Sequence, residues 1–216
     1  MAEIPQVIPR GTQTSVASYD YTDIASGLGF VTYYPCATLS GTGTLAYFLV
    51  TTTDVRPDQD AGGASTTNST VSSLSINFDT STFNLPRTAK GTAFVNFAVR
   101  NPDADVTNCK FSAQLKKVAS DGTTLTNLSS AVERNYGSGG GGALGATTTQ
   151  QIFFSLALTQ TQIKVGEKLR LTIILTLDDA SDNIVMYHDP AGRDLSIGAL
   201  YSTQAKVHMP FRVDTT

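Results

Sequence analysis

The chain has 216 residues, enough to bury a full core in one domain without disulfides or metal ions to hold it together. Its net charge of −3 provides no basic surface of the kind that binds nucleic acid. No stretch approaches the roughly 20 apolar residues that a membrane-spanning helix needs. We therefore expect neither nucleic-acid binding nor membrane binding.

Charged residues make up only 15% of the chain, and Ser and Thr together supply about a quarter of all residues. Thr is β-branched and suits the pleated surface of a sheet. A chain that fills its polar positions in this way is typical of an all-β protein. No segment shows a convincing helical period, and LTQTQIKVG (158–166) would form at most one turn.

Residues 1–25 contain Pro5 and Pro9 and show no sustained period, so we expect them to form an extended N-terminal arm. The same stretch lacks the basic start and the apolar run of a secretory signal, and secretion is not expected. Tyrosines cluster in the first quarter of the chain. We interpret them as anchors that hold the arm and the first strand onto the sheet or onto a neighbouring molecule. The alternative is a platform for stacking on sugars, which the absence of Trp disfavours.

Apolar and polar residues alternate most clearly in CKFSAQLKK (109–117), KLRLTIILTL (168–177) and KVHMPFRV (206–213). Such a period of two predicts half-buried antiparallel strands. TGTLAYFLVTT (42–52), VSSLSINF (71–78), TAFVNFAVR (92–100) and QQIFFSLAL (150–158) are further candidate strands, with turn-forming residues between them. The residues predicted to face inward on the three clearest strands are Cys109, Phe111, Ala113 and Leu115, then Leu169, Leu171, Ile173, Leu175 and Leu177, then Val207, Met209, Phe211 and Val213.

About eight strands separated in this way predict an antiparallel two-sheet β-sandwich, with a jelly-roll-like topology favoured. We expect residues 26–216 to form one such domain. Residues 137–145 are rich in Gly and are expected to form a flexible loop, because ordering glycines costs much conformational entropy. An interdomain linker at this place is the alternative.

MYHDPAGRDL (186–195) gathers His188, Asp189, Arg193 and Asp194 in a chain with only 2 histidines. Neighbouring residues of a strand point to opposite faces, so a hydrogen bond between the His188 and Asp189 side chains is not expected. Asp before Pro, followed closely by Gly, is turn chemistry. We interpret this stretch as a structural corner, with a catalytic site or a partner-contact loop as alternatives.

No other stretch carries a recognisable motif for chemistry. Cys36 and Cys109 lack metal-ligand spacing and form either one disulfide or, as we favour, two buried thiols. DDASDN (178–183) lacks the spacing of an EF-hand and is expected to connect two strands, with a calcium site as the alternative. The turn after residue 163 is expected to leave Glu167 in solvent. We expect no cofactor, no metal ion and no enzymatic activity.

Three stretches carry a likeness to a known family: SYDYTDIASGLGFVTYY (18–34), YHDPAGRDL (187–195) and KVHMPFRV (206–213). Together they resemble the auxiliary capsid proteins, also called decoration or cement proteins, of tailed bacteriophages and related viruses. In that family a Tyr/Asp-rich arm precedes a sandwich, and the chain ends on an apolar strand. The resemblance covers both ends of the chain as a pattern, while the middle third carries no motif.

The resemblance implies a structural protein of the virion, made in the host cytoplasm, that binds and stabilises the lattice of the major capsid protein. It also implies a homotrimer or another homo-oligomer. A tail or fibre component, or an adhesion module that binds host glycans, is the alternative function. A polysaccharide hydrolase comes third, because it would need two carboxylates that converge in a cleft. The candidate residues for partner binding are Tyr19, Asp20, Tyr21, Tyr33 and Tyr34.

Overall fold

The computed structural model describes residues 28–39, 45–54, 66–69, 73–102, 108–136, 144–145, 149–177, 184–191 and 204–212. This described part contains strands and turns but no helix, and therefore no helix able to cross a membrane. Its strands are β1 (Leu28–Leu39), β2 (Leu45–Val50), β3 (Thr66–Ser69), β4 (Ser73–Asp79), β5 (Arg87–Arg100), β6 (Cys109–Val118), β7 (Leu125–Asn127), β8 (Val132–Tyr136), β9 (Thr149–Ile163), β10 (Lys168–Leu177), β11 (Ile184–Tyr187) and β12 (Lys206–Arg212).

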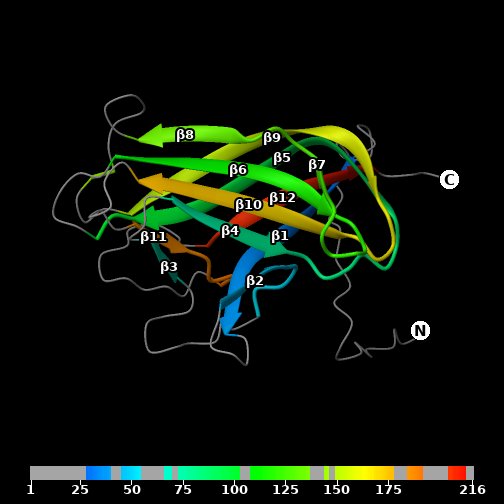
Figure 1. Ribbon diagram of the computed structural model, residues 1–216, viewed down its shortest axis with the longest axis horizontal. Helices are drawn as coiled ribbons and strands as arrows, with labels where there is room; N and C mark the ends of the chain where they lie inside the picture. The colour runs from blue at the N-terminus through cyan, green and yellow to red at the C-terminus, as the bar shows by residue number, and fades with distance from the viewer. Residues whose placement is uncertain are drawn as a thin grey trace, which may run out of the picture.

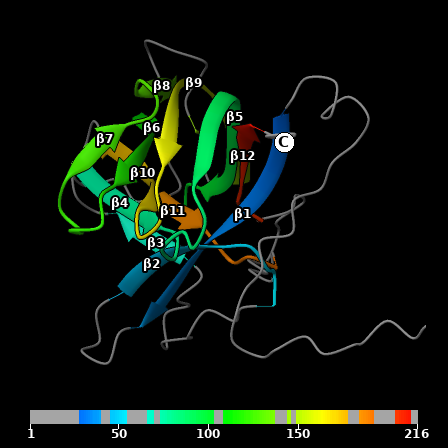
Figure 2. The same cartoon turned by 90° about the vertical axis from the view of Figure 1, so that its right-hand side faces the viewer.

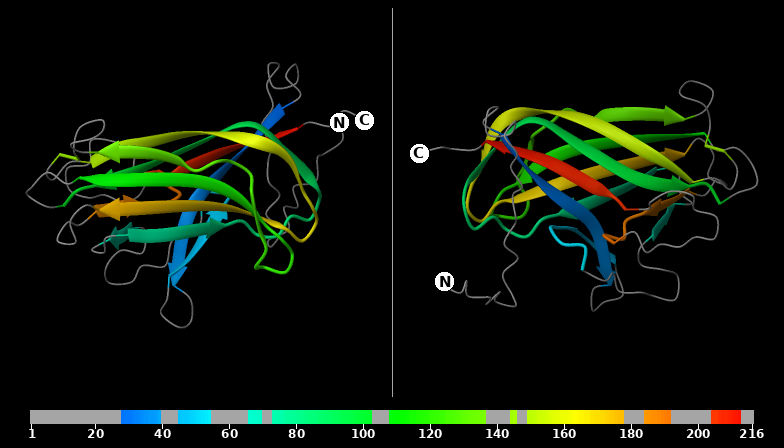
Figure 3. Two further views of the ribbon diagram at one scale, coloured as in Figure 1. Left: turned by 45° about the horizontal axis from the view of Figure 1, so that its top comes forward. Right: turned by 180° about the vertical axis from the view of Figure 1, so that it is seen from behind.

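Hydrogen bonds join the strands in the order β3-β11-β5-β12-β1-β2-β4-β10-β6-β7, with β9 paired to β5 and β8 paired to β6 (Figure 1). Strand β1 divides this path, because its first half pairs with β12 and its second half with β2. The strands before the division form a first layer and those after it a second layer, and the two layers face each other (Figure 2). Seen from behind, β1, β12, β5 and β9 lie side by side (Figure 3).

The prediction of an all-β fold is confirmed. The two layers are nevertheless joined through β1 and belong to one hydrogen-bonded path, where the sequence pattern suggested two separate sheets. All strand pairs are antiparallel except β2 and β4, which meet in parallel at Phe48 and Asp79. Alternation along a strand carries no information about which neighbour the strand will pair with, so the sequence could not show this junction.

The core lies between the layers and is built from the inward faces that the alternation predicted. Every predicted inward residue of β6, β10 and β12 within the described part is at most 4% exposed. The ring of Phe97 of β5 packs edge-on against that of Phe111 of β6 and stacks on that of Phe154 of β9. The distance between ring centroids is 5.9 Å in both pairs. These contacts join the two layers into one hydrophobic cluster.

The layers also meet along the side where β8 approaches β9. The backbone N–H of Thr159 donates to the carbonyl of Leu128 at 2.8 Å, and Ser129 and Leu158 form an isolated bridge. Further along, Arg134 Nε donates to the Phe153 carbonyl at 3.3 Å. Together these bonds satisfy part of an edge that would otherwise be open.

Two details of the fold differ from the sequence-based expectation. LTQTQIKVG forms the end of β9 and a turn, because β9 continues to Ile163. Glu167 lies in the interior at 8% exposure, where it binds Lys117 at 3.0 Å and accepts the Lys164 N–H at 2.6 Å. The cation and the N–H donor together stabilise the ionised carboxylate of Glu167 in this buried position. The sequence could not show this, because Lys117 is distant from Glu167 in the chain.

The predicted arm (1–25), residues 137–143 of the predicted Gly-rich loop, and the possible calcium loop at 178–183 lie outside the described residues. The last two residues of the Gly-rich stretch are described. Leu144 is buried at 2% exposure, and its carbonyl accepts a hydrogen bond from Asn101 at 3.4 Å.

Candidate functional site

The His188 corner is a structural element. Asp189 Oδ1 accepts the backbone N–H of Ala191 at 2.8 Å, and Pro190 begins the turn, so the predicted turn is confirmed as far as Ala191. Arg193 and Asp194 lie outside the described residues. His188 is fully buried, and burial lowers its pKa to about 4. Its ring packs edge-on against the rings of Tyr47 of β2 and Phe78 of β4, with 5.9 Å between ring centroids in each pair. This histidine therefore packs the end of β11 onto the second layer.

The predicted partner-binding residues are separated by the fold. Tyr33 is only 4% exposed and points inward from β1, while its neighbour Tyr34 is half-buried on the opposite, outward face. Tyr19, Asp20 and Tyr21 lie outside the described residues. Binding of a partner by these residues stays a prediction.

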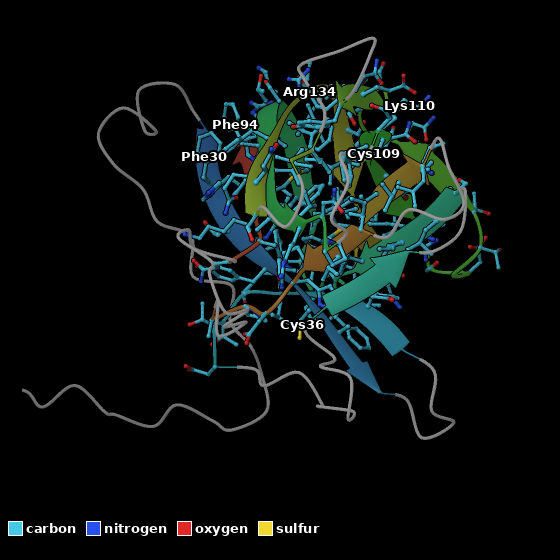
Figure 4. The ribbon with its side chains drawn as sticks, turned by 90° about the vertical axis from the view of Figure 1, so that its left-hand side faces the viewer. Phe30, Cys36, Phe94, Cys109, Lys110 and Arg134 are labelled. Carbon is cyan, nitrogen blue, oxygen red and sulfur yellow. The ribbon has the colours of Figure 1, made fainter. Side chains whose placement is uncertain are left out.

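A surface with a distinct composition covers the outward side of β1, β12, β5 and β9. We call it the aromatic–basic face and define it by Phe30, Phe94, Phe153, Lys206 and His208. Phe94 is 47% exposed and Phe153 is 63% exposed, although aromatic side chains of this size are usually buried. Figure 4 shows Phe30 and Phe94 on this layer, with Arg134 nearby at the edge of the second layer.

The register of the strands aligns side chains in rows across this face. Phe94 lies opposite His208, and His208 lies opposite Thr32 on the next strand. His208 Nδ1 and the Thr32 hydroxyl are 3.0 Å apart and hydrogen-bonded. Burial, and secondarily the charge of Lys206, lowers the pKa of His208. At neutral pH this imidazole is therefore uncharged.

A groove of about 240 Å³ lies within the aromatic–basic face. It is lined by side chains from three strands of the first layer and by Arg134 of β8. The sequences of β1, β5, β9 and β12 contain no Asp or Glu, whereas β5 and β12 carry Lys and Arg. A chain with a net negative charge thus presents one face with aromatic rings, cations and no carboxylate from its own strands.

The sequence contained a signal for this face that we did not use. In TAFVNFAVR the inward positions are Ala93, Val95 and Phe97, so Phe94 stands on the side expected to be polar. In QQIFFSLAL the same reasoning places Phe153 outward. Large aromatic residues at the polar positions of an alternating strand indicate an interaction surface. The alignment of these residues across neighbouring strands could not be read from the sequence, because it depends on register.

The other predicted sites have simple outcomes. Cys36 and Cys109 are both buried and form no disulfide, as favoured. His208 is half-buried on the outward face of β12, at the position that the alternation predicts. Among the described residues, no group of three or more His, Cys, Asp or Glu is arranged to hold a metal ion.

No protein-family model and no curated protein sequence matches the chain. Among solved structures, an α-amino acid ester hydrolase aligns with 84% of this chain and 36% of its own, at 11% identity and a TM-score of 0.53. A CocE/NonD family hydrolase from Staphylococcus aureus aligns with 83% of this chain and 36% of its own, at 11% identity and a TM-score of 0.45. A structure of infectious bursal disease virus aligns with 97% of this chain and 59% of its own, at 13% identity and a TM-score of 0.25.

The first alignment shows a shared fold and no more, because the identity is far below the level at which function is shared. The chain spans about a third of the length of the hydrolases it matches. The expectation that the chain is not an enzyme is nevertheless corrected by this finding. Its fold is shared with part of a protein that is named an α-amino acid ester hydrolase, and an all-β, motif-poor sequence gave no sound basis for excluding hydrolysis.

Proposed function

We propose that the chain is a structural component of a virus particle, a decoration protein that binds the major capsid protein lattice through the aromatic–basic face. The observation that carries this proposal is the exposed pair Phe94 and Phe153 on a layer whose long strands contain no carboxylate. Exposed aromatic rings beside cations are typical of the centre of a protein interface. The absence of acidic residues favours an acidic partner surface.

The sequence before β1 supports the same proposal. The predicted N-terminal arm (1–25) precedes β1 in the chain, and β1 contributes Phe30 to the outward side of the first layer. A segment that becomes ordered on binding can add contact area to that of a sheet face. Association of the chain into a homotrimer is part of the proposal, and light scattering on the purified chain measures it directly.

The first experiment is quantitative mass spectrometry on density-purified particles of the virus that encodes the chain. The expected result is a copy number in a fixed, lattice-matched ratio to the major capsid protein. A few copies per particle would place the chain on the tail and favour adhesion. Complete absence from particles would overturn a structural role in the virion.

The second experiment tests the face itself. Replacing both Phe94 and Phe153 with Ser should weaken binding to particles that lack the protein by about 30-fold, the loss typical of interface hot spots. The matched control replaces Leu125 and Val165, which are 45% and 61% exposed but lie elsewhere, with Ser. Equal binding by the two double variants would show that the partner does not bind this face.

The hydrolase likeness supports a second candidate, hydrolysis of an ester such as an α-amino acid ester. The feature of this chain that fits is the hydrogen bond between the Thr32 hydroxyl and His208, beside the groove on the aromatic–basic face. A hydroxyl held by a neutral imidazole is the arrangement of a nucleophile and its general base. Thr32 would attack the ester carbonyl while His208 accepts the hydroxyl proton, and His208 would return that proton to the departing alcohol as the ester C–O bond breaks. Water would then hydrolyse the acyl–Thr32 bond, which releases the acid and restores the Thr32 hydroxyl.

This second candidate is tested with the purified chain and α-amino acid esters as substrates. Turnover above the buffer rate that disappears in both Thr32→Val and His208→Gln would establish it. Absence of turnover in the unaltered chain would reject these esters as substrates. Turnover that survives both substitutions would reject Thr32 and His208 as the catalytic pair.

A further inference from the structure

A second pocket, of about 200 Å³, opens where the middle of β1, the end of β2 and the beginning of β5 meet. It shares no lining residue with the groove on the aromatic–basic face. No Asp or Glu lines it, and its one charged group is the guanidinium of Arg87. The residues that line it are Tyr33, Leu49, Thr51, Thr80, Ser81, Thr82, Phe83, Asn84, Leu85 and Arg87.

Arg87 has no carboxylate partner within the described part of the chain. Its guanidinium carbon lies 5.6 Å from the ring centroid of Phe211, which holds the side chain over the ring. Arg170 offers the contrast, because it binds both oxygens of Asp79 at 2.6 and 2.7 Å. The guanidinium of Arg87 therefore keeps its N–H donors available to a ligand.

Tyr33 adds a second donor from the interior of the same pocket. The residue is 4% exposed, and its hydroxyl forms no hydrogen bond with any described residue. Burial raises the pKa of Tyr33 to about 12, against the opposing charge of Arg87, so the phenol keeps its proton at neutral pH. A bound acceptor would give this hydroxyl a hydrogen-bond partner inside the pocket.

One side of the pocket is formed by residues 80–85, a loop that hydrogen bonds hold in place. Thr80 N–H donates to the Leu169 carbonyl at 2.9 Å, and Leu169 N–H donates to the Thr80 hydroxyl at 3.0 Å. Phe83 N–H donates to the Glu167 carbonyl at 2.9 Å, while the Phe83 carbonyl accepts Gly166 N–H at 2.9 Å. Gly166 has a φ of 83°, so its turn suits Gly in particular. The pocket is therefore built before any ligand arrives.

We propose that this pocket binds a small carboxylate, held by the guanidinium of Arg87 and the hydroxyl of Tyr33. One guanidinium balances one negative charge, and its planar pair of N–H groups matches the two oxygens of a carboxylate. The hydroxyl and amide groups of Thr51, Ser81 and Asn84 can hydrogen-bond the rest of the ligand. The carboxylate comes either from a free small molecule or from an acidic side chain of a partner protein. This inference does not depend on the aromatic–basic face, which shares no residue with the pocket.

The experiment follows the N–H signal of the Arg87 side chain by NMR while acetate is added to the full chain at constant ionic strength. Acetamide, which has the same shape without the charge, serves as the control ligand. The expected result is a saturable shift with acetate and none with acetamide. Removing only the hydroxyl with Tyr33→Phe should weaken acetate binding about tenfold, the effect of losing one hydrogen bond to a charged group.

Arginine variants separate the pocket from general charge effects. Arg87→Gln should abolish the acetate-dependent shifts of the neighbouring backbone signals, while Arg100→Gln, at the other end of the same strand, should leave them unchanged. Unaltered acetate binding in Arg87→Gln, or no saturable shift in the unaltered chain, would overturn the proposal. Thermal unfolding of each variant, followed by circular dichroism, shows whether the chain is still folded. Should Arg87→Gln fail to fold, the Tyr33→Phe titration decides.

A short peptide with a central Asp, compared with its Asn counterpart, distinguishes the two sources of the carboxylate. Tighter binding of the Asp peptide than of acetate would identify a partner protein as the source. Equal or weaker binding would identify a free small molecule. Both results support the pocket, and they differ only in where the ligand comes from.

Discussion

The outward sides of the two layers differ in how their polar groups are satisfied. On the second layer, charged and polar side chains pair across neighbouring strands: Arg170 with Asp79 at 2.6 Å, Thr172 with Asn77 at 2.8 Å, and Lys110 of β6 with Glu133 of β8 at 3.3 Å. On the first layer, the strands carry cations without carboxylates and expose aromatic rings. Lys110 lies on the second layer, away from Phe30 and Phe94, in Figure 4.

Under the proposed function, the second layer is adapted to water and the first to a partner. Cross-strand pairs stabilise a sheet that faces solvent without any other molecule. A face with exposed rings, and with cations but no carboxylates on its own strands, gains stabilisation when a partner covers it. Substitutions in the core, at the junction and on each outward face should therefore affect stability to different degrees.

The largest effect is expected in the core that both layers share. Phe97→Ala should lower the free energy of unfolding by about 3–5 kcal/mol, because Phe97 is 1% exposed and contacts rings of both layers. Urea unfolding should show one transition, whether followed by circular dichroism or by tyrosine fluorescence. Two separate transitions would mean that the layers are independent units. Phe153→Ala is the exposed control and should change stability by about 0.5 kcal/mol at most.

The second effect concerns the junction between the layers at His188. Its folded pKa of about 4 lies below the ordinary 6.5, so below pH 6.5 the unfolded chain binds a proton that the folded chain does not. Stability should therefore fall as the pH drops from 6.5 toward 4, by about 3 kcal/mol in total, and this loss should level off below pH 4. Urea unfolding between pH 7 and 5, before carboxylates titrate, measures the slope.

His188→Phe keeps an aromatic ring between Tyr47 and Phe78 and removes the proton-binding group. Its stability should fall much less over the same pH range, and the remaining slope is expected from His208, whose pKa is also lowered by burial. An equal slope in the variant and the unaltered chain would mean that another group causes the pH dependence. The variant thus separates the packing of the ring from its titration.

A smaller effect is expected from the ion pairs of the second layer. A double-mutant cycle with Asp79→Asn and Arg170→Gln should give a coupling free energy of about 1 kcal/mol, because the bond is bidentate and partly buried. The cycle for Lys110 and Glu133, which are 41% and 53% exposed, should give less. Coupling of equal size in both cycles would mean that geometry and burial do not decide the strength of these pairs.

The sequence was informative wherever one residue type and its spacing decide the structure. The alternation in β6, β10 and β12 predicted the inward side chains, and KLRLTIILTL matched β10 residue for residue. Asp189 and Pro190 predicted their turn, because that turn needs only local hydrogen bonds. In each case the physical cause lies within a few neighbouring residues.

The sequence was uninformative wherever distant strands meet. Arg87 and Tyr33 are 54 positions apart in the numbering, and only the pairing of β1, β12 and β5 brings them to one pocket. Glu167 was expected in solvent because the sequence does not show that β6 and β10 are neighbours. That pairing brings Lys117 to Glu167. Short strands such as β7 and β8 show no clear alternation, since their side chains are mostly exposed. Register and partner choice depend on the whole fold.

The smallest effect on stability is expected on the aromatic–basic face, where substitutions are proposed to weaken particle binding most. Replacing Phe94 and Phe153 with Ser should change the free energy of unfolding by less than about 1 kcal/mol. The two side chains are 47% and 63% exposed and do not belong to the buried core. Urea unfolding of the double variant, beside its binding to particles, gives both quantities. A loss of stability of 2 kcal/mol or more would mean that the rings belong to the core and not to an interface. A variant that keeps its stability but no longer binds particles would show that these two rings are needed for binding and not for folding. Ser at both positions leaves the core between the layers unchanged and removes only the exposed aromatic rings of the first layer.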